Sequence, residues 1–330
     1  MPRTTPSRTT PPRPADIASL FPALRSLARP ATRLHPRPGA PTVHDSSVGG
    51  PLLWPADEPW PVCAVPHKRR NGHRIVDVRR AREILRQAWT KNPRTGPDPE
   101  DTALLAAFRR GRHAPHLTDT DPLPLLAVAQ LYAADVPHLP LGGDTDVLQV
   151  LWCPYERHGD RHEVGVHLRW RRSADVLDAR GTQPEPPLTD RPGLVPTSCV
   201  LHPEPITEYP HWEALPAGLR SRIEQRWDAD TYLSDLSTAP GWKVGGHINW
   251  RLTGPASPRC DACGAGMQPL LTVDAREWDR GSDSWTPLED TPHARDMGAN
   301  TPTDIDAGRG QLTIAVCGRN LLHPHGLISQ

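Results

Sequence analysis

The sequence predicts an α+β protein that is rich in β-strand, built from an internal duplication of antiparallel strands with a helical insertion in its first half. Three observations lead to this expectation. Ordered sequence blocks recur in the two halves of the chain, the apolar segments are short and partly alternating, and a charged helical pattern is concentrated in one interruption of the first half. No apolar run is long enough for a membrane helix, and the first residues lack the apolar stretch of a secretory signal.

The recurring blocks follow the same order in both halves. Each half begins with Val-Gly-Gly, continues through Trp to a cysteine, and then contains two apolar segments, the second of which ends in Cys. The residues are Val48-Gly49-Gly50, Trp54, Trp60, Cys63, 124–131 (PLLAVAQL) and 146–153 (DVLQVLWC) in the first half, and Val244-Gly245-Gly246, Trp250, Cys260, 269–275 (PLLTVDA) and 310–317 (GQLTIAVC) in the second. The order of three blocks is far less expected by chance than any one of them, so it favours a duplication.

Composition divides the chain further. Proline is enriched, with 41 residues among 330, or about 12% against a usual ~5%. We expect residues 1–15 to be a disordered basic tail and residues 16–330 to form a single domain. Within that domain we expect two pseudo-repeats, at 44–171 (with the insertion at 68–121) and at 230–330. A Pro-rich loop and a helix at 178–229 join them.

Three helical segments are expected before the repeated strands. Residues 17–28 have apolar residues at helical spacing after Asp16, a plausible N-cap, and Pro22 implies a helix that is either short or begins near that proline. Residues 79–90 form a charged amphipathic pattern. Asp98 followed by Pro99 is typical of a helix start, because the carboxylate caps the helix and proline suits its first position.

The remaining elements are expected to be strands, with one helix between the two sets. Short or alternating apolar runs predict strands at 124–132, 146–153 and 163–171, and again at 245–252, 268–275 and 310–317. Residues 178–211 are expected to be loop, and 215–227 a helix. The Gly-Gly pairs are expected to allow close backbone approach or positive φ at a strand start. Trp54, Trp60 and Trp250 are expected to pack in the core, and an aromatic groove for a partner is the alternative.

The net charge is zero, with 38 basic and 38 acidic residues, but its distribution is uneven. Residues 1–38 carry seven Arg and one Asp, and residues 67–116 carry 13 Lys or Arg against five Asp or Glu. The rest of the chain is therefore strongly acidic. A basic segment in an acidic frame is read either as a solvated, internally compensated helical insertion or as an arm that docks on nucleic acid or an acidic partner.

The order VGGPLLWPADEPWPVC, LPLLAVAQLYAADVPHLPL and LQVLWC, followed by WKVGGHINW, resembles the YwqG-like family of bacterial domains of unknown function. The resemblance covers roughly residues 17–66 and 122–325 and implies an α+β fold built from repeats with antiparallel sheet. It implies no activity, because the family has no established general biochemistry. The layout of two parts with cysteines is also remotely similar to the programmed-cell-death-protein-2 family, which is associated with chaperoning a ribosomal protein.

Metal binding is the strongest chemistry in the sequence. Cys260 and Cys263 form a CxxC motif followed by glycine, which supplies two thiolates for one tetrahedral ion. Cys317 ends the matching strand, and either His323 or His325 could complete a Cys₃His structural zinc site; His323 is the residue we expect. The alternatives are unliganded thiols that happen to be close, and a redox CxxC, for which no βαβ pattern is present.

The first half offers a weaker, analogous set. Cys63 and His67 stand where the second half has its CxxC motif, and Cys153 stands where it has Cys317. His158 and His162 follow Cys153, and His158 is the one we expect. The sequence therefore predicts a second, Cys₂His₂ site. Cys199 fits neither set.

Function is left to three hypotheses. The first is a non-catalytic protein-interaction module with a structural zinc site and a protein partner, because no GxSxG, Walker A or GxGxxG motif is present. The second is a nucleic-acid- or ribosome-associated protein that uses residues 68–91, with nine basic and two acidic residues. The third is a metal-dependent hydrolase with an open zinc position. Six cysteines without a secretory signal indicate the cytoplasm, and no membrane partner is expected.

Overall fold

Two six-stranded antiparallel sheets form the body of the protein. The computed structural model describes residues 8–70, 72–109, 116–159, 163–278 and 283–330. The first sheet runs in the order β2 (Arg37–Pro38), β11 (Cys199–Val200), β3 (Ser47–Val48), β7 (Leu126–Tyr132), β8 (Val147–Trp152) and β9 (Val166–Arg171). The second runs in the order β12 (Glu204–Glu208), β1 (Arg29–Arg33), β13 (Lys243–Gly245), β14 (Met267–Asp274), β15 (Gln311–Cys317) and β16 (Gly326–Ser329). The expected α+β class with antiparallel strands is confirmed.

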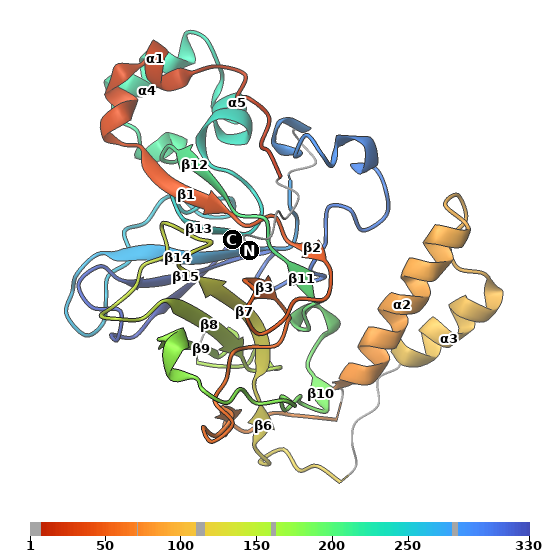
Figure 1. Ribbon diagram of the computed structural model, residues 1–330. Helices are drawn as coiled ribbons and strands as arrows, with labels where there is room; N and C mark the ends of the chain where they lie inside the picture. Colours follow the sequence, from red (N-terminus) through yellow and green to blue (C-terminus); the bar gives the residue numbers. More distant parts are fainter. Residues whose placement is uncertain (1–7, 71, 110–115, 160–162, 279–282) are drawn as a thin grey trace.

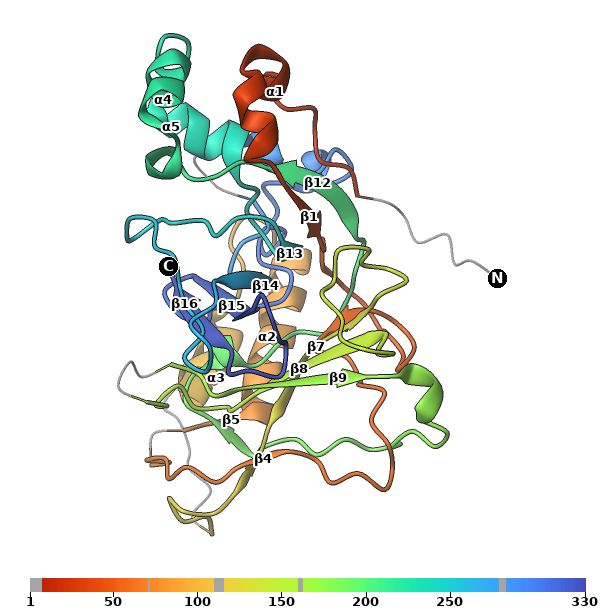
Figure 2. The same cartoon turned by 90° about the vertical axis from the view of Figure 1, so that its left-hand side faces the viewer.

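The main core lies between the two sheets, which form successive layers in Figure 2. One cluster of buried side chains takes Val128 and Val150 from β7 and β8, and Leu271 and Ile314 from β14 and β15. Every residue of β8 and β15 is buried. Such mostly apolar, fully buried strands are typical of sheets that are covered on both faces.

Two short antiparallel strand pairs form small sheets in addition to the two large ones. β4 (Val62–Cys63) pairs with β6 (Leu123–Pro124), and β5 (His73–Arg74) pairs with β10 (Leu188–Thr189). The first pair closes the base of the insertion, because its two strands lie on either side of residues 68–121 in the sequence.

A group of short helices packs at one end of the second sheet (Figure 1). It contains α1 (Ile17–Leu20), α4 (Ala217–Glu224), α5 (Ala229–Thr231), the 3₁₀ turns Pro22–Ser26 and Trp212–Ala214, and the π-helical turn Tyr232–Ser237. Asp16 caps α1 by accepting from the backbone N–H of Ser19 at 3.0 Å, as expected. Pro22 divides the expected helix 17–28 into α1 and a 3₁₀ turn, since proline cannot donate the next helical hydrogen bond. The remaining 3₁₀ turns are Ser173–Asp175, Pro192–Leu194, Asp283–Trp285 and Thr291–His293.

The insertion forms two helices, α2 (Ile75–Lys91) and α3 (Pro99–Arg109), which lie side by side at the edge of the body (Figure 1). Asp98 accepts from the N–H of Asp101 at 2.9 Å, which confirms the expected cap. Ile75 and Val78 anchor α2 in the main core. Five of the eleven described basic residues of the insertion form ion pairs, which are Arg69–Asp121, Arg74–Asp77, Arg79–Glu185, Arg82–Asp304 and Arg86–Glu83.

Two of the expected segments differ in the structure. The loop expected at 178–211 contains β10, β11 and β12, and these last two strands enter the first and second sheets. A strand was expected at 245–252. The structure instead has β13 (Lys243–Gly245), which ends where the expected strand begins. Gly245 and Gly246 both have φ +71°, and a left-handed backbone cannot continue an extended strand.

The N-terminal segment also differs from the expected disordered tail over residues 1–15. Residues 1–7 lie outside the described part of the chain. Arg8, however, pairs with Asp290 at 3.1 Å, and the guanidinium of Arg13 lies 3.6 Å from the ring centroid of Trp285. Residues 8–13 therefore pack against the segment that contains Trp285 and Asp290. Within the described residues, no helix combines the length and apolar character needed to cross a membrane.

Candidate metal centres

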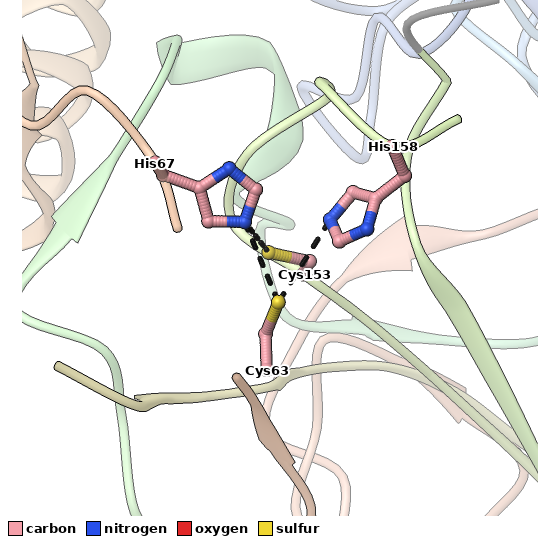
Figure 3. A group of neighbouring side chains, drawn as sticks. All are labelled: Cys63, His67, Cys153 and His158. Carbon is pink, nitrogen blue, oxygen red and sulfur yellow. Dashed lines mark hydrogen bonds between the residues drawn. The ribbon is translucent and has the colours of Figure 1, made fainter. Parts of the chain in front are cut away.

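The first cluster joins Cys63, His67, Cys153 and His158, whose ligand atoms all lie within 4.8 Å of one another. Figure 3 shows the four side chains pointing toward a common centre. The Nε2 atom of His67 lies 3.4 Å from Cys63 Sγ and 3.3 Å from Cys153 Sγ, and His158 Nε2 lies 3.9 Å from Cys63 Sγ. A single imidazole nitrogen cannot form two ordinary hydrogen bonds with two thiols, whereas a metal ion between them accounts for both short distances.

Strand ends place two of these ligands, and a loop places a third. Cys63 ends β4, and Cys153 directly follows β8, where its N–H donates to Gly165 O at 2.8 Å. His67 lies at the root of the insertion, and its N–H donates to Asp119 O at 2.9 Å. The backbone of both ends of the insertion is therefore tied together next to the cluster.

Packing orients the two imidazole rings. Tyr155 stacks on His67 with ring centroids 4.9 Å apart and an angle of 16° between the planes. The ring of His158 lies over Gly165, where a Cβ atom would come within 2.8 Å of the ring carbon Cε1. Glycine is therefore required at position 165 if His158 is to reach the cluster. No sequence signal marked Gly165 beforehand.

Burial affects the protonation of the Cys and His side chains of the first cluster. Cys63, His67 and Cys153 are 8%, 2% and 1% exposed. Burial, followed by the charges of His158 and Arg69, lowers the pKa of His67 to about 4, so this imidazole is neutral and free to donate its lone pair at neutral pH. Burial also raises the pKa of Cys153. A buried thiol of this kind loses its proton readily only to a metal ion or a strong base.

The second cluster joins Cys260, Cys263, Cys317 and His323, again with all ligand atoms within 4.8 Å. Cys260 Sγ lies 3.6 Å from His323 Nδ1, and Cys263 Sγ lies 3.5 Å from Cys317 Sγ. His323 is thus the histidine that completes the set. His325 is outside it, and His162, the alternative in the first half, lies outside the described residues.

A tight turn builds the CxxC side of this cluster. The N–H of Gly264 donates to Cys260 O at 2.8 Å, and the N–H of Cys260 donates to Ala265 O at 2.8 Å. Gly264 has φ +68°, which only glycine adopts without cost. On the other side, the N–H groups of Arg319 and Asn320 point at Cys317, the last residue of β15, and lower the pKa of its thiol to about 6. Backbone donors of this kind favour the thiolate that binds metal.

The spacing of both clusters fits tetrahedral coordination. Bonds of about 2.3 Å to sulfur and about 2.0 Å to nitrogen place a tetrahedral S and N about 3.6 Å apart and two S atoms about 3.8 Å apart. The sulfur–nitrogen distances are 3.3, 3.4, 3.6 and 3.9 Å, and the sulfur–sulfur distance is 3.5 Å. Both clusters could therefore hold a metal ion, and the eight residues are those that the sequence singled out.

The other residues named from the sequence lie elsewhere. Cys199 is buried and donates from its thiol to Pro302 O at 3.3 Å, away from both clusters. Trp54 and Trp60 are buried, with ring centroids 5.1 Å apart, and belong to the same apolar cluster as Cys63 and Cys153. Core packing is confirmed for this pair, which lies in the apolar surroundings of the first cluster.

Comparison with known proteins does not assign the chain to a family. No protein-family model matches the chain, and no curated protein is similar to it by sequence search.

Proposed function

We propose that this protein is a non-catalytic, protein-interaction module that binds two structural zinc ions, one at each cluster. The observation that carries the proposal is the convergence of eight Cys and His ligand atoms into two groups, each within 4.8 Å. Each group is assembled from strand ends and loops that are distant in sequence. A bound ion would therefore cross-link the ends of the sheets, and its binding free energy would add to the stability of the fold.

Four protein ligands at each centre support a structural role over a hydrolytic one. A catalytic zinc ion has three protein ligands and keeps its fourth position for water or substrate. In both clusters a fourth side chain, His158 or His323, fills that position. Sulfur and imidazole donors also favour zinc over magnesium or calcium, which prefer oxygen ligands. The cytosolic location expected from the sequence belongs to this proposal, because the thiols must stay reduced to bind.

We further propose that the two halves arose by duplication, in keeping with the resemblance to the YwqG-like family. The strand pairing supports this idea. In the first half, Val62, which precedes Cys63, pairs with Pro124. In the second half, Arg259, which precedes Cys260, pairs with Gly266 in the same antiparallel sense. The equivalent strand pairs β7–β8 and β14–β15 also each contain one bulge, between Ala127 and Ala129 and between Pro269 and Leu271.

This register corrects one detail of the sequence match. Ala129 lies opposite Val150, and Leu271 lies opposite Ile314. Under the proposed duplication, Leu271 is the counterpart of Ala129, and the PLL match, which aligned Leu271 with Leu126, is displaced by three residues.

The helical insertion is the surface that we assign to a protein partner. α2 and α3 lie at the edge of the body and expose Val76 and Leu104, which are 59% and 40% accessible. The ion pairs within the described part of the insertion reduce the charge available for phosphate contacts. The exposed apolar side chains are what favour a protein partner.

Metal analysis of the purified protein tests the proposal. We expect two equivalents of zinc in the wild type, and one in each of Cys63→Ser and Cys260→Ser. Cys199→Ser is the matched control, because it removes a buried thiol that is in neither cluster, and it should retain two. Wild-type protein that binds no zinc after reconstitution would refute the proposal.

The interaction role has its own test. A photo-cross-linking amino acid at Val76 or Leu104 should give a discrete protein adduct in cells. The same group at Leu177, which is 96% exposed and outside the insertion, is the control and should give none. Adducts with nucleic acid at Val76 would instead support the accessory-protein hypothesis.

A further inference from the structure

The two clusters differ sharply in access to solvent. In the first, Cys63 and Cys153 are both buried in the apolar cluster around Trp54 and Trp60. In the second, Cys260 and Cys317 are buried, but Cys263 is exposed. Of the six cysteines, Cys263 is the only one that is not buried.

Cys263 also faces an open pocket. The pocket has a volume of about 460 Å³ and is lined by Cys263, the glycines of the adjoining turns, and the side chains of Arg259 and Arg319. The guanidinium of Arg259 is held there by donating to Gly264 O at 3.0 Å. Arg259 and Arg319 therefore bring two basic residues to the pocket that Cys263 lines.

A second sulfur stands ready to react with the first. Cys317 Sγ lies 3.5 Å from Cys263 Sγ, and Cys317 is shielded from solvent behind it. An accessible thiolate with a neighbouring cysteine is the arrangement in which oxidation ends in a disulfide instead of proceeding to higher sulfur acids.

We propose that Cys263 is a site of oxidation by peroxides, that Cys317 resolves it, and that the reaction releases the second zinc ion alone. This inference rests on the proposed function, since it requires zinc at the second cluster. The reaction class is two-electron oxidation by hydrogen peroxide or an alkyl hydroperoxide, and it makes the second centre a peroxide-responsive site.

The steps balance as follows. The Cys263 thiolate attacks one peroxide oxygen, the O–O bond breaks, and the leaving hydroxide or alkoxide takes a proton from water, which leaves a sulfenic acid on Cys263. The Cys317 thiolate then attacks that sulfur and displaces hydroxide, forming the disulfide. The two electrons lost by the pair of sulfurs reduce the peroxide to water, or to water and an alcohol. Two of the four zinc ligands are consumed, and the ion departs from the remaining Cys260 and His323.

The test uses full-length protein loaded with two equivalents of zinc and treated with hydrogen peroxide. Released zinc is measured with a chromogenic chelator, and the disulfide by mass spectrometry of non-reduced peptides. We expect one equivalent to be released, a Cys263–Cys317 linkage to form, and zinc to be taken up again after reduction by a dithiol. Release of both ions together, a Cys63–Cys153 linkage, or retention of both ions would overturn the inference.

A variant separates oxidation from simple loss of a ligand. Cys263→His keeps four zinc ligands but removes the exposed sulfur, so it should hold two equivalents and release neither under the same treatment. Release of one equivalent from this variant would show that Cys263 is not the site of reaction. Protein that cannot be loaded with zinc at either cluster refutes the proposed function, whereas two zinc ions that resist peroxide refute only this inference.

Discussion

His67 Nε2 lies 3.3 Å from Cys153 Sγ, although 86 residues separate the two along the chain. His67 belongs to the root of the helical insertion, and Cys153 follows a central strand of the first sheet. The contact therefore connects the insertion to the most buried part of that sheet. A metal ion at this point would fix where the insertion leaves the body, and the second cluster would do the same for the tight turn after Cys260.

Removal of zinc should destabilise the fold itself. Structural zinc contributes about 10–16 kcal/mol in isolated zinc-finger peptides, and this protein has a larger core of its own. Loss of about 5 kcal/mol would lower the midpoint of thermal unfolding by about 7 °C for a chain of 330 residues. Calorimetry with and without a strong chelator measures the shift. An unchanged midpoint together with a lost hydrolytic activity would favour the metal-dependent hydrolase.

Gly165→Ala should weaken the first centre selectively. The added Cβ would meet the ring of His158 at 2.8 Å and displace it. Substitutions that disturb the residues supporting a metal ligand typically cost about 10- to 100-fold in affinity. Competition titration with a zinc chelator should show this loss at one of the two sites. Gly181→Ala is the matched control, since no atom lies within 4 Å of the added Cβ, and both of its sites should keep wild-type affinity.

The ligands could be predicted from the sequence because their chemistry and position are both local signals. A CxxC motif followed by glycine, and a cysteine at the end of each matching strand, are visible without a structure. The choice between His323 and His325 is different. Both lie in one short loop, and only the folded backbone determines which imidazole reaches Cys260. Gly165 was missed because its role is steric and depends on a ring that reaches it from another part of the loop.

Two of the strands that were missed share a physical cause. β1 and β12 contain Pro30 and Pro205, and proline in a short polar segment argues against a strand. In the structure β12 is an edge strand, where a missing N–H is tolerated. The central strands β8 and β15 were predicted well, because burial on both faces makes their sequences mostly apolar.

Glu208→Gln should be strongly destabilising. Lys243 Nζ lies 2.6 Å from Glu208 Oε1, and both side chains are 0% exposed. The substitution leaves a buried ammonium without a counter-charge, for which we expect a cost of about 3–5 kcal/mol in the free energy of unfolding. Urea denaturation measures it. The double variant Glu208→Gln/Lys243→Met should be more stable than the sum of the single losses, because it removes the unpaired charge.

An exposed ion pair provides the control for this prediction. Glu83 and Arg86 form a pair on the surface of α2, with side chains 38% and 66% exposed. Glu83→Gln should leave the free energy of unfolding close to that of the wild type, because solvent screens an exposed ion pair. Equal costs for Glu83→Gln and Glu208→Gln would mean that burial of the Lys243 pair does not determine its contribution.

His247 should make the protein less stable in mild acid. Burial, followed by the positive charge of Arg29, lowers the pKa of His247 to about 4, from an ordinary value of 6.5. Between these values the unfolded chain binds a proton that the folded chain does not, so the free energy of unfolding decreases as the pH falls from about 6.5 to about 4. The full effect is at most about 3 kcal/mol.

Urea unfolding of wild type and His247→Gln at pH 7 and pH 4.5 tests this dependence. Glutamine can still donate to Leu27 O, as the Nε2 atom of His247 does at 3.0 Å, but it has no proton to gain. The variant should therefore lose less stability than the wild type between the two pH values, and proton competition at the zinc ligands affects both proteins equally. His293→Gln, at a side chain that is 75% exposed, should behave like the wild type. Parallel losses in wild type and His247→Gln would assign the acid sensitivity to other groups.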